Sequence, residues 1–154
     1  MPARFRFRLE SLLRVRVALE EEAKRRLAVA VLARDRAAAR VAELREAQRV
    51  ALESRRTGLN EAVDLDRWRA TERFLLVVER RIAEAEEAVA QAEARVAEAR
   101  QALLKAHQDQ LVLQRLKERR QEQHALELLH EETREMDEIA VLRYHFTHSQ
   151  ASNR

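Results

Sequence analysis

The chain has 154 residues, of which only one is Gly and one is Pro. Because Gly and Pro mark most turns, this scarcity excludes a fold rich in turns and predicts long helices. Charged residues make up 37% of the sequence but leave a net charge of only +3, whereas nucleic-acid-binding domains are usually far more basic. The chain has no Cys and no apolar run long enough for a membrane span, so we expect neither disulfides nor direct membrane insertion.

The first predicted helix covers about residues 6–57. Residues 1–8 lead into it, and Pro2 is tolerable at a helix start. Arg alternates with apolar residues here, so the apolar segment of a signal peptide is missing and we expect a cytoplasmic protein. Three Arg fall on the apolar stripe, where their stems can lie along apolar surface. The stripe, in steps of three and four, is Phe5, Leu9, Leu12, Arg16, Leu19, Ala23, Arg26, Ala30, Ala33, Ala37, Arg40, Leu44, Ala47 and Ala51.

A break is predicted at about residues 58–66. Gly58 suits the end of a helix, and Asn60 follows it. Asp64 or Asp66 suits the N-cap of the next helix. An alternative is that the first helix continues past Gly58 and turns nearer Leu65.

The second predicted helix covers about residues 67–146, and its heptad pattern is the strongest in the chain. The pattern is lost at residues 117–124, which contain no apolar side chain, and it resumes in a shifted phase at Leu126. This gap indicates either a phase slip or the point at which the helix extends beyond its partner. Residues 149–154 are expected to form a frayed tail. The main stripe is Trp68, Thr71, Leu75, Val78, Ile82, Ala85, Val89, Ala92, Val96, Ala99, Leu103 and Ala106.

Two features predict that these helices fold back on each other. Residues 28–47 contain eight Ala and residues 83–102 contain nine, which allows close antiparallel approach with position i opposite about 130 − i. Residues 1–16 carry five Arg, while residues 121–138 carry seven acids, and a hairpin brings these opposite charges together. We therefore predict one elongated all-α domain over residues 1–154, a long antiparallel two-helix coiled coil whose second helix is the longer. About twenty residues of that helix would project alone. A parallel homodimer is the alternative.

Catalysis is not expected. One interior Gly cannot form a phosphate-binding loop, and two paired helices offer no cavity that excludes water. His145 and His148 are spaced to share a metal ion, but we expect all five His to be solvated, so neither a metal nor a cofactor is predicted. Phe74 and Val77 lie off the main stripe on one face. Periodicity alone leaves open whether the turn covers them or whether they form a partner-binding patch.

Three stretches resemble the flagellar FliJ family. Residues 5–16 (Phe-Arg-Phe-Arg-Leu-Glu-Ser-Leu-Leu-Arg-Val-Arg) resemble its opening Phe-x-Phe-x-Leu-x-x-Leu-Leu-x-x-Arg. Residues 72–75 (Glu-Arg-Phe-Leu) resemble its Tyr-x-x-Phe-Leu element, with Thr71 at the place of the Tyr. Residues 113–119 (Leu-Gln-Arg-Leu-Lys-Glu-Arg), with Asp137 and Glu138, resemble its Leu-x-x-Leu-x-Glu-Arg and terminal Asp-Glu.

The resemblance implies a non-enzymatic stalk of the flagellar type III export apparatus, similar to the central shaft of rotary ATPases. Such a stalk would insert its paired termini into the hexameric ring of the export ATPase and contact the cytoplasmic domain of the large export-gate membrane protein. It would lie at the flagellar base, peripheral to the inner membrane. The implied gate-binding residues are Phe74, Leu75, Val77 and Val78. The implied ring-binding residues are Phe5, Phe7, Arg14, Arg16, Met136 and Ile139.

Other functions remain open at this point. The stalk of a virulence injectisome would have the same architecture, although the Phe-x-Phe-x-Leu start favours the flagellar system. A generic scaffold built as a parallel homodimer belongs to a different class, and its oligomeric state would distinguish it. Whether the stalk also escorts export chaperones is left open by the resemblance.

Overall fold

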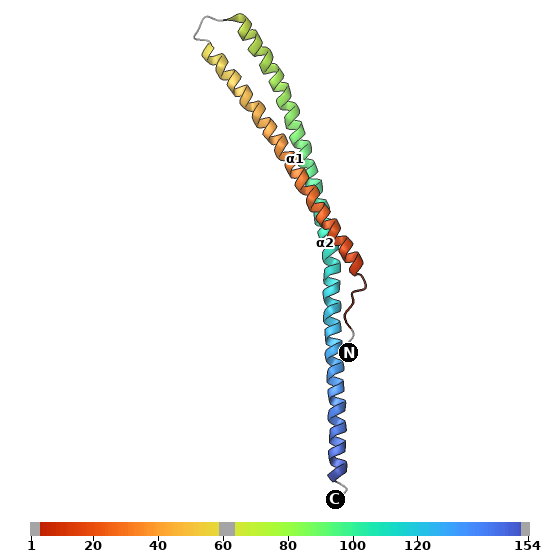
Figure 1. Ribbon diagram of the computed structural model, residues 1–154. Helices are drawn as coiled ribbons and strands as arrows, with labels where there is room; N and C mark the ends of the chain where they lie inside the picture. Colours follow the sequence, from red (N-terminus) through yellow and green to blue (C-terminus); the bar gives the residue numbers. More distant parts are fainter. Residues whose placement is uncertain (1–3, 59–63, 152–154) are drawn as a thin grey trace. The chain divides into compact units, whose positions relative to one another are not determined.

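The computed structural model describes residues 4–58 and 64–151 and, within these ranges, contains two α-helices and no β-strand. Helix α1 spans Glu10–Thr57 and helix α2 spans Leu65–Ala151 (Figure 1). The helices pack against each other in antiparallel order, and α2 is the longer. The predicted antiparallel helical hairpin is therefore confirmed. Predicted features at Pro2, at Asn60 and in the last residues of the tail lie outside the described residues.

Helix α1 begins at Glu10 rather than at about residue 6. Residues 4–7 have no helical backbone, and the N–H of Glu10 donates to the carbonyl of Phe7 at 3.2 Å. In an extended chain, successive side chains point to opposite sides. Phe5 and Phe7 are accordingly half-buried, while Arg4, Arg6 and Arg8 are exposed. The alternation of Phe and Arg suits an extended segment better than a helix, which explains the later start.

Asp64 caps the N-terminus of α2. Its Oδ1 accepts hydrogen bonds from the N–H of Asp66 at 3.0 Å and from the N–H of Arg67 at 3.3 Å. Such a cap supplies acceptors for the N–H groups that the first turn of a helix leaves without partners. Of the two predicted candidates, Asp64 is therefore the cap. Gly58 directly follows α1 without the left-handed backbone that a Gly often adopts there.

The chain divides into two units. Unit 1 combines Met1–Val17 with Gln108–Arg154, and unit 2 is Ala18–His107. Each unit holds a segment from the N-terminal part of the chain and a segment of α2. The expectation of a single domain over residues 1–154 stays a prediction.

The seam of α2 agrees with the predicted heptad. Every member of the stripe from Trp68 to Ala106 is buried or half-buried. Val78, Ala92 and Val96 are the most deeply buried. These side chains are small, which suits two helices that approach closely.

The N-terminal stripe differs from the predicted one at several positions between residues 9 and 40. The residues that were expected on the seam but are exposed are Leu9, Leu12, Leu19, Arg26, Ala33 and Arg40. The residues on the seam instead follow a ladder that shares Arg16, Ala23, Ala30, Ala37, Leu44 and Ala51 with the prediction. Between those shared positions, the seam uses the next residue along the chain. The residues used in place of the predicted ones are Leu13, Glu20, Leu27, Arg34 and Val41, whereas Ala47 is half-buried as predicted, together with its neighbour Gln48.

The difference between the predicted and the observed stripe of α1 has a physical reason at two positions. Leu27 and Val41 take the places that the prediction gave to Arg26 and Arg40. Burying an aliphatic side chain stabilises the pair, whereas burying a guanidinium without a partner costs free energy. At these two positions, packing against α2 therefore places an aliphatic side chain on the seam and leaves the neighbouring Arg in solvent, although Glu20 and Arg34 are half-buried on the same seam.

In unit 2 the side-chain pairs between the helices fix their register. Glu20 pairs with His107, so the two residue numbers add to 127. The same sum is 131 for Arg45 with Glu86 and 127 for Arg55 with Glu72. Since one partner's number falls as the other's rises, the helices are antiparallel. The sums lie close to the predicted value of about 130, so the predicted register is confirmed to within a few residues.

Unit 1 shows the same antiparallel order. Lys117 Nζ lies 2.9 Å from Glu10 Oε2, and Arg16 Nη1 donates to Asp109 Oδ2 at 3.2 Å. These residue numbers add to 127 and 125. Both pairs are partly exposed, so each contributes little to stability but helps to set the alignment.

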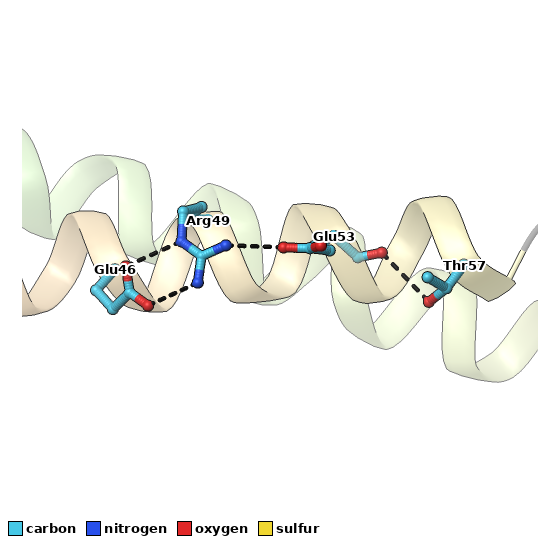
Figure 2. Close-up of polar contacts among 4 residues, drawn as sticks. All are labelled: Glu46, Arg49, Glu53 and Thr57. Carbon is cyan, nitrogen blue, oxygen red and sulfur yellow. Dashed lines mark hydrogen bonds and ion pairs between the residues drawn. The ribbon is translucent and has the colours of Figure 1, made fainter.

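The outer face of α1 carries ion pairs within the helix, shown in Figure 2. Arg49 donates from two nitrogens to the carboxylate of Glu46, at 3.0 and 2.8 Å, and from a third to Glu53 at 2.8 Å. The hydrogen bonds with Arg49 lower the pKa of the Glu46 carboxyl. Spacings of three and four residues bring such side chains together on a helix surface, so these contacts support α1 without any partner.

Candidate partner-binding surfaces

The N-terminal segment of unit 1 borders two grooves against α2. The first has a volume of about 770 Å³, and Phe5, Phe7, Leu116 and His124 are among the residues that line it. The ring of Phe5 meets the ring of His124 edge to face, with 5.7 Å between their centroids. Aromatic and aliphatic side chains therefore form a surface here that is only partly covered.

The second groove of unit 1 is strongly basic. It has a volume of about 560 Å³, and its lining includes Arg4, Arg6 and Arg14. Glu10 also borders it, but its carboxylate is already paired with Lys117. The groove therefore presents guanidinium groups, which bind carboxylates well.

Of the four N-terminal residues proposed for ring binding, three remain available at the surface. Phe5 and Phe7 are half-buried beside the grooves, and Arg14 is exposed. Arg16 is half-buried and donates to Asp109, so a partner would have to compete with this ion pair.

Beyond the N-terminal segment, α2 continues with no other described part of unit 1 alongside it (Figure 1). We call residues 129–149 the overhang. Every side chain in the overhang is exposed, which confirms the prediction that about twenty residues project alone. Met136 and Ile139, the remaining residues proposed for ring binding, lie here. The large apolar side chains exposed in the overhang are Leu129, Met136, Ile139, Val141, Leu142, Tyr144 and Phe146.

Unit 2 holds a third groove, between the helices near the turn. Its volume is about 590 Å³, and it is lined mainly by small and apolar residues. Phe74 borders it and is 47% exposed, and Val77, one turn further along α2, is 49% exposed. The apolar surplus after the turn therefore lies at the surface. The groove is lined by Glu46, Ala47, Val50, Ala51, Ser54, Arg67, Ala70, Thr71 and Phe74.

The other two residues proposed for gate binding belong to the seam. Leu75 is half-buried, and Val78 is only 3% exposed. A partner could contact Val78 only if the helices separated. Thr71, which also lines the groove, donates its hydroxyl to the carbonyl of Arg67 at 3.0 Å.

Sequence reasoning missed the contacts of two His and one side of the groove near Phe74. His124 was expected in solvent but is half-buried against Phe5. His107 is exposed, as expected, but its Nδ1 also lies 3.0 Å from Glu20 Oε1. The predicted register already contained the signal, since it places Phe5 opposite residue 125. Val50 belongs to the exposed face of α1, and no pattern in α1 alone connects it with Phe74.

Near the C-terminus, His148 contacts a tyrosine of the preceding turn. His148 Nδ1 donates to the carbonyl of Tyr144 at 3.0 Å, and the two rings lie 4.0 Å apart. Over residues 4–58 and 64–151, no three His, Asp or Glu side chains come together in a way that could hold a metal ion. Within the same ranges, no polar or charged side chain is buried. Neither helix, as far as it is described, has a stretch long and apolar enough to cross a membrane.

The surfaces described above offer apolar contact and charge, which is the chemistry of protein–protein interfaces. Among models of known protein families, the model of the flagellar FliJ protein matches residues 5–148, nearly the whole chain. No curated protein and no solved structure matched the chain. The resemblance seen in the three sequence motifs is therefore confirmed over almost the full length. The chain belongs to the flagellar FliJ family and is a component of the flagellar type III export apparatus.

Proposed function

We propose that this chain is a non-enzymatic stalk that couples the flagellar export ATPase to the export gate. The observation that carries the proposal is the overhang, a helix whose side chains are all exposed although many are large and apolar. A solvated helix of this composition is stabilised by docking on another protein. The family match favours the flagellar apparatus over an injectisome as the setting.

Unit 1 is the proposed contact for the ATPase ring. It combines the overhang with the N-terminal segment and its two grooves. Met136 and Ile139 supply apolar contact, and Arg14 supplies charge for carboxylates on the ring. Aromatic residues, Met and Arg are enriched at protein interfaces, and Phe5 and Phe7 fit the same pattern.

Unit 2 is the proposed contact for the export gate. Phe74 and Val77 are exposed on one face, and the groove beside Phe74 has room for a side chain of a partner. A gate contact would place the chain in the cytoplasm at the flagellar base, peripheral to the inner membrane. Leu75 and Val78 then act indirectly, because they hold Phe74 and Val77 in place from the seam.

The proposed coupling is steric and electrostatic. A helical stalk inside a ring of identical subunits contacts those subunits unequally. Because a ligand shifts a conformational equilibrium only by its differential affinity for the states, unequal contacts favour different states in different subunits. ATP hydrolysis would then move the stalk relative to the ring, and the gate contact would transmit that motion.

The first test is ATP hydrolysis by the export ATPase of the same organism, titrated with this chain. We expect stimulation that saturates near one chain per hexameric ring. The double variant Met136→Asp with Ile139→Asp should remove the stimulation, because two carboxylates replace the apolar contact. Val141→Asp, in the same exposed helix, is the control. No stimulation of an ATPase that is shown to form rings would contradict the proposal.

A second test addresses the gate contact. Phe74→Ala and Val77→Asp should each weaken binding to the cytoplasmic domain of the gate protein, measured by calorimetry. Leu76→Asp is the matched control, since Leu76 is an exposed neighbour that lies off the face shared by Phe74 and Val77. Equal binding by all three variants would show that the gate contact lies elsewhere.

A further inference from the structure

One face of the overhang carries six residues in regular steps of three and four. The steps place them in a single stripe along α2, and all six side chains are exposed. In chain order the stripe is apolar, acidic, apolar, apolar, basic and apolar. The six residues are Leu129, Glu132, Met136, Ile139, Arg143 and Phe146.

This stripe is complementary to itself when it is read in the opposite direction. A second copy laid antiparallel would bring Leu129 against Phe146 and Met136 against Ile139. In each such pair the residue numbers add to 275. With the same centre, the remaining pair is Glu132 against Arg143, which have opposite charges. Antiparallel coiled coils pack the two kinds of seam position against each other in this way.

We propose that the overhang associates with the overhang of a second copy of this chain, in antiparallel orientation. Neither Glu132 nor Arg143 has an ion pair among the described residues, so both are free for the second copy. By two-fold symmetry, each Glu132–Arg143 contact occurs twice. A parallel pair would instead place Glu132 on Glu132 and Arg143 on Arg143, and like charges in contact oppose association.

The residues that flank the stripe do not oppose the pairing. Thr133 and Ala140 lie beside it and face each other in the antiparallel arrangement, so no like charges meet there. The helix is already formed in the isolated chain, which removes the cost of nucleating it. Since the stripe covers fewer than three heptads, the pairing is weak and reversible, with a dissociation constant on the order of 0.1 mM or below.

Pairing of two overhangs does not depend on the proposed stalk function but has a consequence for it. Pairing covers Met136 and Ile139, the residues proposed to contact the ATPase ring. A second copy and the ring therefore compete for the same face. Free chains protect their own apolar surface, and the ring displaces the second copy by mass action.

The test is sedimentation of the purified full chain over micromolar to submillimolar concentrations. The wild-type chain should form dimers at the upper end of this range. Arg143→Glu and Glu132→Arg should each weaken dimerisation about tenfold or more, because two attractions become two repulsions. Mixed one to one, these two variants should recover dimers, since each supplies the charge that the other lacks. Arg134→Glu, the same change on the opposite face, is the control.

Recovery in the mixture shows that the single variants are folded, because a misfolded chain cannot be rescued by its complement. Raising the salt concentration should weaken the wild-type dimer. Two results would overturn the proposal. One is a wild-type chain that stays monomeric over the whole concentration range. The other is association by Arg143→Glu as strong as that of the wild type.

Discussion

Two stretches of the same helix behave in opposite ways. The stripe of α2 from residue 68 to residue 106 consists largely of Ala and Val and is buried or half-buried throughout. The overhang carries larger apolar side chains, such as Met136 and Phe146, and all of them are exposed. Both stretches are helical and both have a heptad-like pattern. What separates them is the presence of α1 or of the N-terminal segment alongside.

The size of the side chains follows from this difference. Within the hairpin, small residues such as Ala92 permit close helix approach. In the overhang, larger residues such as Met136 and Phe146 offer more contact area to a partner supplied from outside the chain. Small residues thus accompany the pairing inside the chain, and large exposed ones accompany the surface proposed for other proteins.

The largest effect is expected when a charge enters the paired stretch. Val78→Asp should reduce the free energy of unfolding by about 3 kcal/mol or more, because a carboxylate would be buried without a partner. Val141→Asp, the same change in the overhang, should alter it by less than about 0.5 kcal/mol. Urea unfolding followed by circular dichroism measures both. Equal losses would mean that the overhang is packed as well as the seam.

A smaller effect should distinguish the observed seam of α1 from the predicted one. Leu27→Ala should cost about 2 kcal/mol, since Leu27 lies on the observed seam. Leu19→Ala should cost less than about 1 kcal/mol, because Leu19 is exposed. Thermal unfolding of the two variants shows which of the two residues lies on the seam. A larger loss of stability for Leu19→Ala would place Leu19, rather than Leu27, on the seam.

Phe5→Ala should move the boundary between the paired and unpaired parts of α2. Loss of the packing on His124 should cost about 1 kcal/mol locally and speed amide hydrogen exchange in residues 116–127. Amide exchange in the overhang should not change, because its side chains are exposed in the described structure. Phe146→Ala is the control. Unchanged exchange in residues 116–127 would show that the N-terminal segment does not hold this part of α2.

The smallest expected change in the free energy of unfolding depends on pH and comes from Glu20, in the paired part of the helices. The hydrogen bond with His107, and then the contacts with Lys24, lower the pKa of Glu20 below its ordinary value of 4.5, although burial opposes the shift. A carboxyl whose pKa is lowered by folding stabilises the fold above its unfolded pKa. That contribution is lost as the pH falls through the lower folded pKa.

The wild-type chain should therefore be more stable than Glu20→Gln at pH 7, by less than about 1 kcal/mol. The difference should disappear on acidification below pH 4.5. Glu131→Gln, in the overhang, should show no such difference at either pH. Unfolding curves of the variants at neutral and acidic pH provide the measurement. A difference for Glu20→Gln that persists in acid would rule out the carboxylate as its source.

The candidate surfaces were only partly readable from the sequence. Met136 and Ile139 could be placed on an exposed helix, because the predicted antiparallel register leaves the last twenty or so residues of the second helix without a partner. The groove beside Phe74 could not be found, since Val50 enters it from a helix that is distant in the sequence. The same is true of the contact between Phe5 and His124, which becomes visible only once the register is known.

The sequence was enough to predict two long helices, a break near Asp64, the antiparallel order and the seam of α2 between Trp68 and Ala106. Each of these features follows from local residue types and spacing or from the distribution of Ala and charge along the chain. All of these can be read from the sequence. The sequence of α1 alone did not decide between the predicted stripe and the observed one, because the two stripes overlap and share many of their residues. Packing against α2 made that choice by burying Leu27 and Val41 and leaving Arg26 and Arg40 in solvent. A stripe read along one helix cannot show which of its neighbours a partner will cover.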